Sequence, residues 1–239
     1  MRAMLTLFVC LLLSLPAAAA PLSLVLNTPL AAPLSTPAHD GALDLIYAEL
    51  ARRTGIAIVL QAMPAERGLQ NANRGLDDGE VARVPGMERE YPNLVQVPEP
   101  VLRYQLVAFS RQALQLDGSA SLRPYDVGIP HGWKILERLI NQHQSRVSLA
   151  SGQQLLAMLN KERLDVVVLE RLQGLQLIRS MCLQGIRALR PPLFEGDGFL
   201  YLHRKHADLV PPLAAALRAM KQDGSYQRIV DSVLQRYPG

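Results

Sequence analysis

The sequence predicts an α/β protein of two similar lobes, and three observations carry this prediction. Short apolar strands alternate with amphipathic helices between Leu22 and Val84, which is typical of a parallel sheet with covering helices. The succession of helix, polar turn and strand in 64–84 returns in 154–170. The strand and two helices that close the chain are too short to form a domain of their own. We therefore expect the chain to return to the first lobe, crossing between the lobes twice.

The first lobe is predicted to comprise residues 21–104 and 196–239. Its first helix is expected over 42–53, where apolar residues recur at helical spacing and Gly55 follows as a stop. The segment 56–60 is predicted to be a fully buried strand. A second helix follows Pro64, with Leu69, Ala72 and Leu76 on its buried face and Gly75 as its end. The closing elements are expected to be a strand over 198–203 and helices over 209–221 and 226–237.

Proline-rich segments are predicted to run over the surface of this lobe. The loop 27–40 contains three prolines and cannot be regular helix or central strand. The stretch 85–100 contains four prolines and a mixed-charge patch, so we expect it to wrap the lobe without adding to its core. The crossings between the lobes are expected near 104–110 and 190–199.

The second lobe is predicted to comprise residues 105–195, including the crossing strands. It repeats the alternation of strands and helices in under a hundred residues. Strands are expected over 104–110, 126–129, 146–149, 164–169 and 186–189, with helices over 132–142 and ending near Asn160 and Met181.

Composition excludes some classes of protein. Hydrophobic residues make up 49% of the chain, which is ample for packed cores. The formal charge is +4, and its 25 basic and 21 acidic residues are interspersed without a basic stripe. We therefore expect no nucleic-acid partner.

The first twenty residues predict export. Arg2 precedes an apolar core over 5–15, and the alanines 17–20 form a small-residue cleavage site, so residues 1–20 are predicted to be a cleaved signal peptide. The expected location is the periplasm, and we expect a monomer. Cys10 lacks the residues that precede a lipid-modified cysteine, which leaves Cys182 as the single mature cysteine, expected to be buried.

Several phrases in this order resemble the type 2 periplasmic solute-binding proteins, in particular the polar amino acid branch of the ABC-transporter binding proteins, family 3. The resemblance spans the mature chain. The phrases are those of residues 44–55, 77–79, 127–132, 159–168 and 223–229. It implies a two-lobed periplasmic binding protein-like type II fold with mixed sheets, helices on both faces and two hinge crossings. It also implies a small polar ligand, no cofactor, and an ABC transporter or a sensor as partner.

The resemblance implies that an arginine of the first lobe grips a ligand carboxylate and that an acidic residue of the second receives its ammonium. Arg83 or, in a shifted alignment, Arg89 lies near the place of the arginine, and Glu170 lies at the place of the acid. The residues themselves leave alternatives open. Arg83 can instead pair with Glu80 or Asp78, Arg89 can be a solvated rim charge, and Glu170 can complement a helix N-terminus.

Three further residues are candidates for ligand contact. Trp133 and Lys134 open a helix whose free N–H groups attract anions, at a turn where the family often has Gly-Ser/Thr-Thr. That departure puts an ordinary α-amino acid ligand in doubt, and Trp133 can equally belong to the core. Arg67 is the third candidate. We expect no metal site at His203 and His206, which have no spaced acidic or cysteine partner.

The predicted function is binding of a small polar solute, an amino acid or related carboxylate, between two closing lobes, without catalysis. Two alternatives remain. One is a dehydratase-like enzyme on the same fold, with Glu170 as its general acid. The other is a protein that has lost its small-molecule site and acts through a protein partner.

Overall fold

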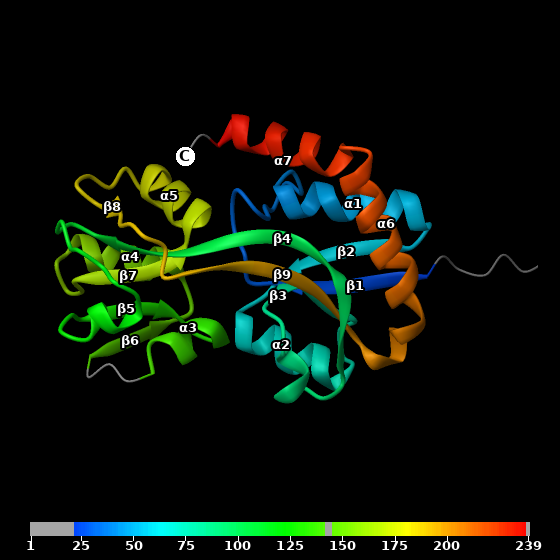
Figure 1. Cartoon of the computed structure of the whole chain (residues 1–239), viewed down its shortest axis with the longest axis horizontal. Coiled ribbons are helices and arrows are strands. Elements are labelled where there is room, and N and C mark those ends of the chain that lie inside the picture. Colours follow the sequence, from blue (N-terminus) through cyan, green and yellow to red (C-terminus); the bar gives the residue numbers. More distant parts are fainter. Residues whose placement is uncertain (1–21, 142–144, 238–239) are drawn as a thin grey trace, which may run out of the picture.

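Two long antiparallel strands extend from one lobe into the other and connect them (Figure 1). They are β4 (Leu94–Ser110) and β9 (Phe194–His203). The computed structural model describes residues 22–141 and 145–237, so the predicted signal peptide lies outside the described residues. Because β4 and β9 belong to both lobes, the strands of both lobes form one hydrogen-bonded sheet in the order β2-β1-β3-β9-β4-β7-β5-β6, with β8 beside β4.

The first lobe surrounds the parallel part of the sheet that precedes β4 in the chain. Strand β1 (Ser23–Thr28) lies between β2 (Ala57–Ala62) and β3 (Gly79–Arg83) and is parallel to both. Helices α1 (Ala42–Thr54), α6 (Val210–Gln222) and α7 (Ser225–Arg236) cover one face, and α2 (Ala65–Arg74) covers the other (Figure 1). Each face has its own apolar core. The return of the chain to this lobe after the second one is confirmed.

The second lobe extends the sheet from β4. Strand β7 (Val166–Glu170) is antiparallel to β4, and β5 (Val127–Pro130) is parallel to both β7 and β6 (Arg146–Leu149). Its helices are α3 (Lys134–Leu139), α4 (Gly152–Asn160) and α5 (Arg171–Ser180), and the short strand β8 (Arg187–Ala188) pairs with β4. Two apolar cores lie on the two faces of this sheet.

Three short 3₁₀-helical segments complete the described chain: η1 (Met87–Arg89), η2 (Ser119–Leu122) and η3 (Arg204–Leu209). The fold is therefore the predicted two-lobed α/β architecture with helices on both faces and two connecting strands. The expectation of separate sheets is wrong, because β4 pairs with β9 and with β7 and so joins the strands of both lobes into one mixed sheet. The lobe limits proposed at 104/105 and 195/196 fall within or beside these strands and stay a prediction.

Two residues of the first lobe, Val59 and Leu76, are exposed although the sequence predicted that they are buried. Strand β2 was expected to be fully buried, yet Val59 is 51% exposed. Strand β2 is the edge of the sheet and pairs only with β1, so one of its faces meets solvent. Leu76 was expected on the buried face of α2 but is 69% exposed, because Gly75 takes a left-handed conformation with φ of 73° and turns the chain away from the helix axis.

The proline-rich stretch 85–100 adds to the core, contrary to the prediction. Its residues Met87, Tyr91, Leu94 and Val97 are buried, and β4 begins within it. The pairing of β4 with β9 shifts register between Gln96 and Leu102, around Pro100. Because the regular hydrogen bonding is interrupted there, the missing backbone N–H of proline is tolerated within the strand. Strand β4 is consequently much longer than the 104–110 segment expected from sequence.

Cys182 is exposed, so the prediction of a buried cysteine is wrong. It follows α5 with a φ of 53°, in the turn that leads to β8, and an exposed turn leaves its thiol on the surface.

Candidate functional site

A cavity lies where the two lobes meet. Both halves of the molecule contribute to it, because β3 ends at Arg83 and β7 ends at Glu170, and ligands of α/β sheets bind beyond the carboxyl ends of their strands. The lining residues are Pro29, Leu30, Leu34, Ala82, Arg83, Val84, Met87, Leu102 and Tyr104 on one side and Trp133, Lys134, Ile135 and Glu170 on the other.

Arg83 lies in the cavity wall and is only 8% exposed. Its Nε and Nη2 donate to Oε2 of Glu80, at 2.7 and 2.6 Å, and Nη2 also donates to the carbonyl oxygen of Ala65 at 3.0 Å. Within the described part of the chain, Nη1 takes part in no hydrogen bond. One side of the guanidinium is therefore held by the protein, and one nitrogen is left for a ligand.

Glu80 is the buried counter-ion of Arg83 and is not accessible to solvent. Burial raises the pKa of this carboxyl to about 7, although the charge and hydrogen bonds of Arg83 oppose the shift. Its Oε1 has no hydrogen-bond partner among the described residues and lies against Gly68, where an added Cβ would come within 2.4 Å of it. Gly68 is thus the residue of α2 that leaves room for this carboxylate.

Glu170 ends β7 and caps α5. It is 3% exposed, and its Oε2 accepts a hydrogen bond from the backbone N–H of Gln173 at 2.8 Å. Burial raises the pKa of Glu170 to about 7, while hydrogen bonds from the backbone of α5 oppose that shift. The residue lines the cavity and caps the N-terminus of α5, as one interpretation of the sequence expected, and its contact with a ligand stays a prediction.

Trp133 and Lys134 bring the start of α3 to the cavity and to the first lobe. Trp133 is partly buried against the core of the second lobe and also lines the cavity. The Nζ of Lys134 lies 2.7 Å from Oε2 of Glu66 on α2 and 3.5 Å from Glu137. Burial lowers the pKa of Lys134, but the hydrogen bond to Glu66 and the nearby negative charges together outweigh that effect and raise it.

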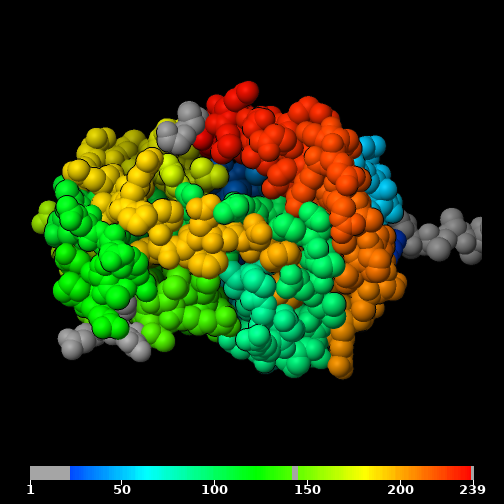
Figure 2. Space-filling view, in the orientation of Figure 1, coloured from blue at the N-terminus to red at the C-terminus, as the bar shows by residue number. Residues whose placement is uncertain are grey.

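The contact between α2 and α3 is a close one. An added Cβ at Gly132 would lie 2.5 Å from the backbone nitrogen of Glu66, and Gly132 has a φ of 77°. A second ion pair joins Arg138 of α3 to Glu90, beyond η1. On the other face of the sheet, Leu172 of α5 packs against the core beneath α1. Figure 2 shows the two halves in contact, with a hollow beneath α7 (red) in which the blue segment of the chain is visible.

The structure does not bring Arg67 or Arg89 to the cavity. Arg67 is exposed, because α2 buries the side formed by Ala65, Gly68, Leu69 and Ala72. Arg89 is exposed as well, because Met87 is the buried residue of η1 and lines the cavity instead. Of the six residues proposed from sequence, Arg83, Glu170, Trp133 and Lys134 meet at one cavity.

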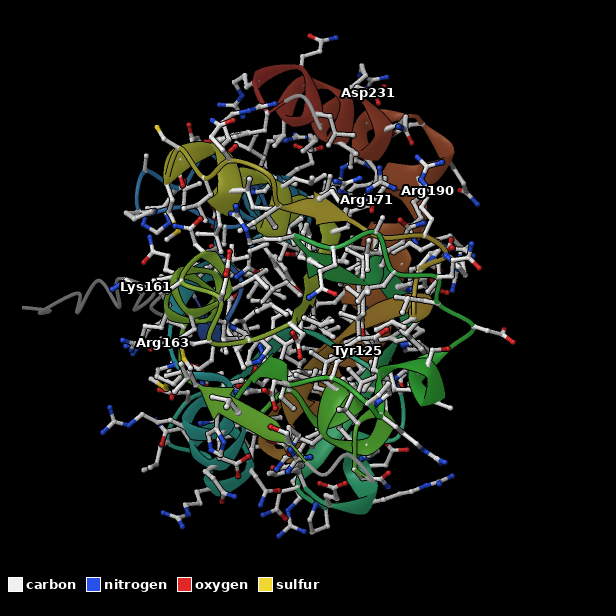
Figure 3. The ribbon with its side chains drawn as sticks, turned by 90° about the vertical axis from the view of Figure 1, so that its left-hand side faces the viewer. Tyr125, Lys161, Arg163, Arg171, Arg190 and Asp231 are labelled. Atoms are coloured by element: carbon white, nitrogen blue, oxygen red, sulfur yellow. The ribbon has the colours of Figure 1, made fainter. Side chains whose placement is uncertain are left out.

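Sequence reasoning missed Tyr104 and the pairing of Glu66 with Lys134. It did offer Glu80 as a partner of Arg83, and the structure shows that pair. Tyr104 lies on β4 where the strand passes from one lobe to the other and stands 6.0 Å from Phe194, measured between ring centroids. Its position at the crossing was a usable signal, because a crossing strand passes the cleft. Tyr125, by contrast, packs against the second lobe's core and does not line the cavity; Figure 3 shows it in the view of the end of that lobe.

Other polar clusters have structural partners. His206 contacts Oδ1 of Asp78 at 2.6 Å, and Lys205 lies 2.8 Å from the same oxygen. Asp78 also accepts a hydrogen bond from the backbone N–H of Val25 at 2.8 Å, which ties the turn before β3 to β1. Among residues 22–141 and 145–237, no group of three or more His, Cys, Asp and Glu side chains is placed to hold a metal ion. Within the same residues, none of the helices has the length and apolar character needed to cross a bilayer.

This architecture, with a cavity between two α/β lobes, is shared with structures of two-lobed binding proteins. The chain is similar to a histidine kinase sensor domain with similarity to periplasmic binding proteins (TM-score 0.77, 15% identity, 90% of this chain and 96% of that one). It is also similar to the arginine-, lysine-, histidine-binding protein ArtJ from Geobacillus stearothermophilus (TM-score 0.73, 13% identity, 92% and 97% covered). A third similar structure is the amino acid ABC transporter substrate-binding protein AbpA from Streptococcus pneumoniae bound to L-arginine (TM-score 0.72, 15% identity, 90% and 94% covered).

These comparisons confirm the resemblance at the level of fold: the chain has the two-lobed fold of the type II periplasmic binding proteins. The three structures named here are described as two binding proteins and a sensor domain. In sequence, the chain is 29% identical over 200 residues to an uncharacterized protein of Shewanella oneidensis, covering 77% of this chain and 73% of that protein. No family model matches the sequence.

Proposed function

We propose that the protein is a periplasmic solute-binding protein that encloses a small ligand between its two lobes and presents the closed form to a membrane partner. The single observation that carries this proposal is the cavity whose wall is formed from both lobes, by Arg83 and Tyr104 on one side and Trp133, Lys134 and Glu170 on the other. A ligand that contacts both walls stabilises the closed arrangement more than the open one, and this difference drives closure.

The partner is proposed to be an ABC transporter or a sensor. Support comes from the similar structures, which include an amino acid ABC transporter substrate-binding protein and the sensor domain of a histidine kinase. The predicted signal peptide supports the periplasmic location, and we expect the protein to act as a monomer. Sedimentation velocity of the purified protein checks that expectation.

Native mass spectrometry of protein purified from its own periplasm tests the binding function. We expect a retained small molecule that is released on denaturation. Titrating the released compound back while recording small-angle scattering should reduce the radius of gyration, because closure brings the lobes together. Binding without any compaction would contradict the closing mechanism.

One observation favours a second candidate function. Glu170 is a buried carboxyl in the cavity wall with a pKa raised to about 7, and a general acid at neutral pH needs such a value. If the protein were dehydratase-like, Glu170→Gln would abolish turnover of the bound compound while retaining its binding. If it only binds, the wild-type protein returns the compound chemically unchanged after prolonged incubation.

A further inference from the structure

The wall of the interlobe cavity is mostly apolar. Ten of its thirteen lining residues have aliphatic or aromatic side chains, and three, Arg83, Lys134 and Glu170, are charged. A ligand that fills such a cavity gains free energy by removing its own apolar surface from water, whereas a wholly polar ligand loses hydration there. The body of the ligand should therefore be apolar.

The charged groups of the wall are already compensated by the protein. Arg83 is paired with Glu80 at 2.6 Å, and Lys134 is paired with Glu66 at 2.7 Å. Glu170 accepts a hydrogen bond from the N-terminal backbone of α5. The cavity therefore lacks the two uncompensated charges of opposite sign that would pair with the carboxylate and the ammonium group of a zwitterion.

Three hydrogen-bond donors of the wall remain available to a ligand. Nη1 of Arg83, the hydroxyl of Tyr104 and the indole N–H of Trp133 take part in no hydrogen bond within the described residues. Burial raises the pKa of Tyr104, which therefore keeps its proton and can donate it. Donors of this kind recognise acceptor oxygens, such as those of a carboxylate.

An ammonium group finds a poor partner in the same wall. Glu170 is its one carboxyl group, it is held by α5, and its raised pKa of about 7 means that it is partly neutral near pH 7. A neutral carboxyl does not offset the desolvation of an ammonium group.

We infer that the cavity selects a small carboxylate with an aliphatic or aromatic body and no α-amino group, in preference to the corresponding amino acid. The inference rests on the proposed function and narrows its ligand class.

Matched pairs of ligands test this inference by isothermal titration calorimetry. One pair is 4-methylpentanoate and L-leucine, and the other is 3-phenylpropanoate and L-phenylalanine, so that each pair differs in the α-amino group alone. We expect the deaminated acid of at least one pair to bind tenfold or more tightly than its amino acid. Tyr104→Phe, which removes a hydroxyl from the wall, should weaken that binding about tenfold.

Two matched controls assign the binding to this cavity. Tyr125→Phe makes the same change at a residue that does not line the cavity, and it should leave the affinity unchanged. Ala82→Leu places a larger side chain in the wall and should abolish binding, whereas Ala207→Leu at an exposed position of η3 should not. Binding that survives Ala82→Leu in a folded variant would place the ligand elsewhere and overturn the inference.

The remaining outcomes separate the inference from the proposed function. If either amino acid binds as tightly as its deaminated partner, the inference is wrong and the solute-binding function stands. If none of the four compounds binds, the inference is also wrong, and native mass spectrometry of the periplasmic protein decides the function independently.

Discussion

At the scale of the residue, burial decides what the charged candidates do. Sequence places Arg83 at the end of a strand, and a free guanidinium there could hold a carboxylate with two nitrogens. In the folded chain Glu80, three residues earlier on the same strand, already occupies two of its nitrogens. A buried cation without a partner would be costly, so the internal ion pair satisfies Arg83 before any ligand arrives.

The carboxyl of Glu170 should make stability depend on pH. Its pKa is about 7 in the folded protein against 4.5 for the exposed group, so the folded state binds the proton more tightly. Its contribution is fully present below about pH 4.5 and is lost as the pH rises through about 7; 2.5 pKa units correspond to roughly 3 kcal/mol at most. Glu170→Gln has no ionisable group at this position, so this loss of stability with rising pH should be absent from the variant.

Denaturant unfolding at pH 4.5 and pH 7.5 measures the effect. The stability of Glu170→Gln relative to the wild type should rise by roughly 2–3 kcal/mol between the two pH values. Other groups, such as Glu49 with a pKa near 2, titrate alike in both proteins and cancel in the comparison. A relative stability that stays constant would show that the carboxyl titrates equally in the folded and unfolded states.

Gly132 should control the approach of the two lobes. Its positive φ makes any other residue strained, and a Cβ there would also meet the backbone of Glu66 at 2.5 Å. Gly132→Ala should therefore destabilise the protein by about 1–2 kcal/mol through strain and also increase the radius of gyration. Thermal unfolding and small-angle scattering measure the two effects.

Gly118→Ala is the matched control, because Gly118 has a φ of 75° but nothing within 4 Å of an added Cβ. Gly118→Ala should lower the thermal stability through backbone strain but leave the radius of gyration unchanged. An equal radius of gyration for both variants would mean that Gly132 does not limit the approach of the lobes.

At the scale of the element, α2 and α3 are joined by an ion pair between the lobes. Lys134 and Glu66 are 20% and 30% exposed in their side chains, so the pair is screened by solvent only in part. Lys134→Gln should shift the closing equilibrium toward the open form by about 0.5–1 kcal/mol, a factor of about 2–5. Small-angle scattering at low and high salt measures this shift as a larger radius of gyration.

Arg52→Gln provides the comparison, since Arg52 pairs with Glu49 within α1 and does not join the lobes. It should leave the scattering unchanged. The charge-swapped protein, Lys134→Glu with Glu66→Lys, should recover part of the compaction, and a further expansion in that protein would refute an attractive interlobe contact.

Local sequence patterns predict the ends of helices well and the length of strand β4 poorly. The helices α1, α4 and α6 lie within one or two residues of the predicted ends, because apolar spacing and glycine stops are local signals. Strand β4 was predicted at seven residues and has 17, because its first half contains two prolines and is held by pairing with β9, distant in sequence.

At the scale of the whole molecule, one sheet joins two bodies with separate cores. The cores beneath α1 and beneath α2 belong to one lobe, and the other two cores lie around β5 and β7. Only β4 and β9 connect the two lobes within the described residues, and each lobe has its own cores. We therefore expect a mutation in one lobe to destabilise that lobe and to leave the other nearly unchanged.

Leu156→Ala should distinguish the lobes. Leu156 is fully buried on α4, and truncating such a residue costs about 2–5 kcal/mol. Hydrogen exchange should show faster opening across β5, β7 and α4, with much smaller changes in α1 and β1. Equal acceleration in both lobes would show that they unfold as one unit.

The sequence by itself determined the alternation of strands and helices, the two-lobed class and the positions of Arg83 and Glu170 at strand ends, because periodicity and strand termini are local properties of the chain. Only the tertiary structure decided which side chains meet. Tyr104 lines the cavity because β4 passes it, Glu66 pairs with Lys134 because α2 approaches α3, and Arg67 and Arg89 face solvent. Such contacts join residues far apart in the chain, and their geometry follows from packing that no single stretch of sequence contains.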